Sequence, residues 1–139
     1  MGMPSSPNAR LFYRCAIQRL DEAKILRKND QLTTGAVYLA GYCVECMLKA
    51  LILNGLTKSK QEEMLKSFRG AKAHDFDWLR EQYYRVGGAR FPSGINRNFI
   101  LVTNWSTDLR YLPKTLATKD IDAFLKAADE IRSWIDGRL

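Results

Sequence analysis

Hydrophobic residues recur at helical spacing along most of the chain. Apolar positions repeat every three or four residues over 10–28 and again over 118–136, with charged residues between them, as in amphipathic helices. Residues 31–53 are apolar on most sides and leave only one narrow polar stripe. The stripe is formed by Tyr38, Tyr42, Glu45 and Lys49. A helix of this kind is expected at the centre of a bundle.

Three shorter segments complete the helical pattern. We expect a short helix over 62–68, another over 74–85 and a fourth main helix over 98–109. The β-branched stretch at 99–103 also suits a strand, but no other segment offers a strand to pair with it. We therefore expect a helix there as well.

Several residues mark the expected helix ends. Asn54-Gly55 can end the central helix in a left-handed conformation, and Gly87 can stop the helix over 74–85. Asp75 or Asp77 can cap the start of that helix, and Thr118 can cap the last one. These signals predict an all-α, up-and-down bundle of four to five helices. Residues 1–9 are expected to be a flexible leader and 10–139 a single domain, since 139 residues suffice for one core.

The chain is strongly basic. It has 22 Lys and Arg against 15 Asp and Glu, which gives a net charge of +7. Such an excess favours anionic partners such as RNA, nucleotides or an acidic protein, although a merely solvated basic surface explains it too.

The cysteines and the apolar segments bear on location. Cys15, Cys43 and Cys46 are odd in number and lie in apolar helical patterns, which suits a reducing cytosol. We expect no membrane span and no signal peptide, and hence a cytoplasmic protein. Cys43 and Cys46 have the spacing of half a zinc site, but no further Cys/His pair completes it, so neither a metal nor a cofactor is expected.

Three short motifs follow one another along the chain. They are Glu45 and Lys49 one turn apart, the His74-Asp75 pair followed by Leu79, and the Arg110-Tyr111 pair. In this order they resemble the HEPN family of small helical bundles, and the resemblance extends over about residues 12–135. It implies a HEPN-like bundle associated with RNA or nucleotide chemistry, either as a metal-independent ribonuclease or beside a small nucleotidyltransferase in a toxin–antitoxin module. It also implies a homodimer.

One part of the family pattern is missing. Nuclease members carry a histidine after four to six residues that follow the arginine, and here Thr115, Leu116 and Ala117 stand at those positions after Arg110. Arg69 and His74 have a suitable spacing, but they lie between the second and third helices. We interpret His74 as a structural residue near the start of the third helix.

The candidate site therefore centres on Arg110. Its guanidinium can bind a phosphate, or it can form a salt bridge with Asp108 or Glu45. The expected nucleotide- or RNA-binding residues are Arg110, Tyr111, Lys114, Glu45, Lys49 and Tyr42. The candidates for catalysis are Arg110, Tyr111 and His74, with Lys114 or Asp108 as substitutes for the missing histidine. Tyr38 and Tyr42 can stack on a base or pack against a second subunit, and we favour packing.

Three functions remain open from the sequence. The first is a dimeric nucleotide- or RNA-binding module that acts with a nucleotidyltransferase partner. The second is a metal-independent ribonuclease toxin with an unusual acid–base residue. The third is a dimeric interaction protein without a ligand.

Overall fold

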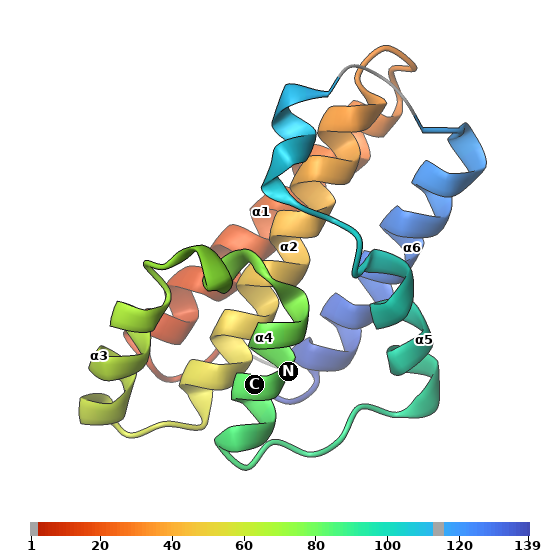
Figure 1. Cartoon of the computed structure of the whole chain (residues 1–139). Helices are drawn as coiled ribbons and strands as arrows, with labels where there is room; N and C mark the ends of the chain where they lie inside the picture. Colours follow the sequence, from red (N-terminus) through yellow and green to blue (C-terminus); the bar gives the residue numbers. More distant parts are fainter. Residues whose placement is uncertain (1–2, 113–115) are drawn as a thin grey trace.

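The protein is a bundle of helices. A computed structural model describes residues 3–112 and 116–139, without the side chain of Arg110. Within these residues there are six α-helices, two 3-10 helices and no strand (Figure 1). They are α1 (Pro7–Arg27), α2 (Thr33–Asn54), α3 (Lys58–Ser67), η1 (Ala71–His74), α4 (Phe76–Arg85), α5 (Ser93–Val102), η2 (Thr107–Tyr111) and α6 (Thr118–Asp136). The all-α bundle is confirmed, with six α-helices in place of the expected four to five.

The central helix is α2, as its apolar pattern predicts. Its neighbours are α1, α4, η2 and α6, and Figure 1 shows α1 and α6 on either side of it. Leu48, Ile52 and Leu53 have no exposed surface. By length and composition α2 could cross a membrane, but most of its most apolar stretch is buried inside the bundle. The other helices cover the apolar surface of α2, as expected for a core helix.

The first helix begins inside the segment expected to be a leader. Pro7 occupies its first turn, where the missing N–H of proline costs nothing. The Ser6 hydroxyl caps the helix by accepting a hydrogen bond from the Ala9 amide (3.3 Å). Because Ala9 is completely buried, residues 7–9 belong to the folded domain rather than to a flexible leader.

Capping residues mark both ends of α4. Asp75 caps α4 by accepting hydrogen bonds from the amides of Asp77 and Trp78, and Gly87, with φ +92°, follows its end. Two expectations are wrong. Gly55 ends α2 with φ −89°, outside the left-handed region, and Thr118 is the first residue of α6 rather than its cap.

The fourth main helix differs most from its expected range of 98–109. Helix α5 starts right after Pro92 and stops at Val102. Ser106 then adopts an extended conformation (φ −147°) and accepts a hydrogen bond from the Asp108 amide, which starts the separate 3-10 helix η2. Arg110 and Tyr111 therefore lie in a short 3-10 turn and not at the end of an α-helix.

Candidate functional site

Two of the predicted ligand-binding residues form a buried ion pair. The Lys49 ammonium lies 2.9 Å from one carboxylate oxygen of Glu45, and His74 Nδ1 lies 2.8 Å from the other. Glu45 and Lys49 are 3% and 5% exposed, whereas the His74 side chain is 43% exposed. Glu45 therefore joins α2 to η1, and only the histidine end of this triad reaches solvent.

Lys49 is enclosed by aromatic rings. Its ammonium lies 5.6 Å from the centre of the Phe12 ring and 5.2 Å from that of Phe68, where the negative faces of both rings favour a cation. Since Glu45 completes this cage, neither charged side chain has surface left for a ligand. We therefore correct the expectation that Glu45 and Lys49 contact RNA or a nucleotide, and assign them to the architecture.

The predicted tyrosines contact a tryptophan that holds η2 against α2. Trp105 is 6% exposed, and its indole N–H donates to the carbonyl of Tyr38 (3.2 Å). The Trp105 ring stacks on Phe76, with centroids 5.3 Å apart, and meets Tyr42 edge-on at 5.2 Å. A Cβ atom at Gly41 would overlap the indole, so a residue without a side chain is needed there. Tyr38 and Tyr42 thus pack inside the chain.

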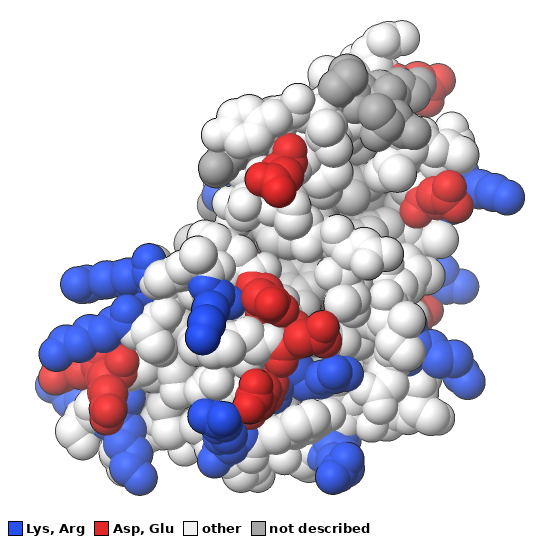
Figure 2. All heavy atoms as spheres, viewed as in Figure 1, with Lys and Arg blue, Asp and Glu red and all other residues white. Residues whose placement is uncertain are grey.

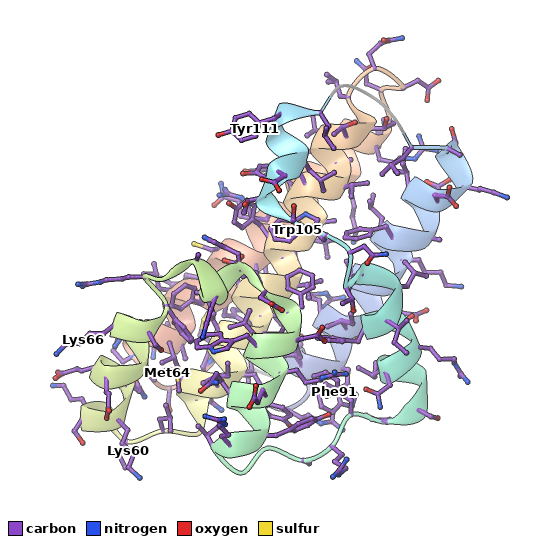
Figure 3. The ribbon with its side chains drawn as sticks, viewed as in Figure 1. Lys60, Met64, Lys66, Phe91, Trp105 and Tyr111 are labelled. Atoms are coloured by element: carbon purple, nitrogen blue, oxygen red, sulfur yellow. The ribbon has the colours of Figure 1, made fainter. Side chains whose placement is uncertain are left out.

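The segment around Arg110 lies on the surface. Tyr111 is 73% exposed, and Figure 3 shows its ring pointing away from the bundle. Asp108 is exposed too, and it forms no ion pair with another described side chain. The side chain of Arg110 and the whole of Lys114 lie outside the described residues. The described neighbourhood of Arg110 is therefore exposed and contains an aromatic ring and a carboxylate.

An open groove of about 470 Å³ lies beside His74. It separates η1 and the start of α4 from the turn after α5. Its polar lining consists of His74, Asp75, Asp77, Thr103, Asn104, Ser106 and Thr107. The groove brings together two segments that lie some 30 positions apart in the sequence. Of its lining residues, only His74 and Asp75 belong to the motifs identified in the sequence. The polar residues at 103–107 carry no recognisable spacing signal.

Two buried cysteines and the possible metal ligands are further groups to consider among the described residues. Burial raises the pKa of the Cys46 thiol to about 12 and that of Cys43 further, so both stay protonated near neutral pH. Among the described residues, no group of three His, Cys, Asp or Glu side chains is placed to hold a metal ion. Arg69 is exposed, and the hydrogen-bonding partner of His74 is Glu45.

Comparison with known families identifies the type of domain. No curated protein and no solved structure is significantly similar to the chain. The HEPN domain profile matches residues 9–138, which is nearly the whole chain and includes the described helices from Ala9 of α1 to the end of α6. The helical bundle, the Glu45–Lys49 pair on α2 and the His74-Asp75 pair before α4 thus occur within this match. The chain belongs to the HEPN domain family, whose members are helical modules associated with nucleotides or RNA.

Proposed function

We propose that this protein is a dimeric nucleotide- or RNA-binding HEPN module. It acts in the cytoplasm with a small nucleotidyltransferase partner, in a toxin–antitoxin-like or defence system. The observation that carries the proposal is the sequence after Arg110, where Thr115, Leu116 and Ala117 occupy the positions of the nuclease histidine. A HEPN chain that keeps the arginine without this proton-transfer group is suited to hold a phosphate rather than to cleave beside it.

The charge of the chain supports an anionic ligand. With a net charge of +7, binding to RNA should weaken steeply as salt rises, because counterions are released from the phosphates. Fluorescence anisotropy of a labelled single-stranded RNA over a range of salt concentrations tests this. No binding by the wild type at low salt would refute the proposal.

Arg110→Ala tests the predicted phosphate contact. Arg110 lies in a surface turn next to the exposed Tyr111, so we expect the free energy of unfolding to change by only about 0–1 kcal/mol while RNA binding weakens. Thermal melting and anisotropy on the same sample separate the two effects. A large loss of stability with unchanged RNA affinity would make Arg110 an architectural residue.

The expected homodimer has a candidate surface next to η2. An apolar groove of about 390 Å³ is lined by Leu101, Trp105, Leu116 and Phe124, and Leu101 is 44% exposed. Monomers rarely leave larger apolar patches uncovered, so a second copy is a reasonable occupant. Sedimentation equilibrium at tens of micromolar would detect the dimer, and a monomer under these conditions would contradict it. A dimer that binds no RNA would favour the third possibility, an interaction protein.

A metal-independent ribonuclease is the second candidate, and the geometry of His74 favours it. When Nδ1 holds its hydrogen toward Glu45, the second ring nitrogen is the one left to accept a proton, such as that of a ribose 2′-hydroxyl. Incubation of tRNA and mRNA with wild type, His74→Gln and Arg110→Ala, with EDTA present, tests it. Cleavage lost in both variants would support the ribonuclease, and cleavage retained in both would assign it to a contaminant.

A further inference from the structure

The helix α3 and the turn that follows it carry a large share of the protein's positive charge. Residues 58–73 contain five basic and two acidic residues, hence a net charge of +3 out of the chain's +7. The basic residues are Lys58, Lys60, Lys66, Arg69 and Lys72, which we call the α3 cations. Figure 2 shows Lys and Arg side chains gathered on the part of the surface that α3 occupies in Figure 1.

The α3 cations are not used by the fold. All five are exposed, and none of them forms a salt bridge with a described carboxylate. Elsewhere many basic side chains are paired: Arg27 with Asp122, and Arg132 with Asp129. Glu62 and Glu63 on the same helix offset part of this charge, and the remaining net charge of +3 is available to an external anion.

Helix α3 is attached to the bundle by the hydrogen bonds of one polar side chain rather than by a broad apolar face. Gln61 is its one buried residue. The side-chain amide of Gln61 donates to the carbonyls of Leu53 (3.1 Å) and Leu56 (3.0 Å), and its oxygen accepts from the Ser6 hydroxyl (2.8 Å). One side chain therefore ties α3 to the end of α2 and the start of α1, while most of the helix surface faces solvent.

A groove lies between α3 and the end of α4. It has a volume of about 690 Å³. Met64 and Val86 supply apolar surface, and Lys60 supplies a positive charge that no described carboxylate pairs with. Glu63 also lines the groove, and so does Arg85, which is paired with Glu81 (2.8 Å). Figure 3 shows Lys60 and Lys66 extending from α3 away from the bundle. Apolar surface next to cations is the combination that holds a base and its phosphates in single-stranded nucleic acid binding.

We infer that the α3 cations bind the phosphate backbone of single-stranded RNA and that the groove between α3 and α4 takes one of its bases. The inference rests on the proposed function and adds a surface separate from Arg110. Helix α3 follows the C-terminal end of α2, whereas Trp105 fixes the segment before η2 to the N-terminal half of α2, at Tyr38. An acidic protein would match the charges alike, but it would leave the apolar groove without an occupant.

A triple substitution tests the surface. Lys60→Gln, Lys66→Gln and Arg69→Gln remove three charges and keep good helix formers in place. We expect RNA affinity, measured by fluorescence anisotropy, to fall about tenfold or more at low salt. The slope of log K against log salt should become shallower by about 2, since each lost single-strand phosphate contact removes about 0.7.

A matched triple variant controls for net charge. Arg97→Gln, Lys119→Gln and Lys126→Gln also remove one arginine and two lysines, all exposed and unpaired among the described residues, from α5 and α6. We expect this control to keep the wild-type slope. Equal losses in both variants would overturn the α3 surface, because net charge alone would then explain binding. Melting curves of both variants should match the wild type, since none of the six side chains forms an ion pair with a described residue.

The outcomes separate the inference from the function on which it rests. No RNA binding by the wild type would refute both. Wild-type binding that survives the α3 triple variant but is lost in Arg110→Ala would refute only the α3 surface. Two further probes test the occupant: we expect inorganic polyphosphate, which lacks bases, and polyglutamate, which lacks phosphates, to bind more weakly than RNA. Polyphosphate binding as tightly as RNA would overturn the base in the groove, and polyglutamate doing so would overturn RNA as the occupant.

Discussion

Replacement of Lys49 by methionine should destabilise the protein severely. Methionine keeps an unbranched side chain between Phe12 and Phe68 but removes the charge that neutralises Glu45. The Glu45 carboxylate would stay 3% exposed with His74 as its one remaining partner. Removing one member of a buried ion pair costs about 3–5 kcal/mol, because the other charge is stranded away from water. For a chain of this size each kcal/mol corresponds to roughly 3–5 °C in Tm.

A double-mutant cycle shows whether the pair itself is responsible. Urea unfolding followed by circular dichroism would compare Lys49→Met, Glu45→Gln and the double variant. We expect the double variant to be more stable than Lys49→Met, because glutamine leaves no buried charge, with a coupling energy of about 1–3 kcal/mol. Lys126→Met is the control, since Lys126 is exposed and should change stability by no more than about 0.5 kcal/mol.

Two results would refute this reasoning. A cost below about 1 kcal/mol for Lys49→Met would mean that water reaches the pair, as it does for surface salt bridges. Strict additivity of the two single substitutions would mean that Glu45 and Lys49 do not depend on each other, although their charged atoms lie 2.9 Å apart.

Two further predictions concern packing and pH. Gly41→Ala should cost about 1–3 kcal/mol and change tryptophan fluorescence, because the new methyl group overlaps Trp105, whereas Gly35→Ala on the same helix has room and should be neutral or stabilising by up to about 1 kcal/mol; equal effects would contradict the close approach. Burial alone would raise the pKa of Asp129, but hydrogen bonds from Arg132 outweigh it and hold the pKa below its ordinary value. The ionised pair therefore stabilises the fold fully above the unfolded pKa of about 3.9, and this contribution is lost as pH falls through the lower pKa of the folded state. Between pH 6 and about 2.5, the urea midpoint of Asp129→Asn should therefore fall less than that of the wild type. Parallel pH dependence would contradict this role of Asp129.

Much of the fold followed from local patterns. The apolar spacing of residues 118–136 predicts α6 because a helix face is set by residues three and four apart. The apolar sides of α2 predict its central position for the same reason, since such a helix has no face to offer to water. The HEPN resemblance likewise rested on short motifs whose order is visible without coordinates, and the family match confirms it.

The C-terminal end of α5 depended on contacts between residues that are far apart in the sequence. Periodicity alone extends a helix through 98–109, but Trp105 must leave the helical path to stack on Phe76 and lie over Gly41. Gly41 is 64 positions earlier in the sequence, and its missing side chain has meaning only once α2 and this segment lie together. Tertiary packing therefore overrode the local helix signal and placed Arg110 in a separate turn.

The candidate site shows the same limit most clearly. A glutamate and a lysine four residues apart look alike on an exposed helix face and in a buried cage, because the spacing specifies only that the two side chains can meet. Burial of Glu45 and Lys49 depends on Phe12, Phe68 and His74, which come from other segments of the chain. The sequence alone determined that these two charged side chains can meet. The tertiary structure decided that they are shielded from water and so belong to the core instead of the binding surface.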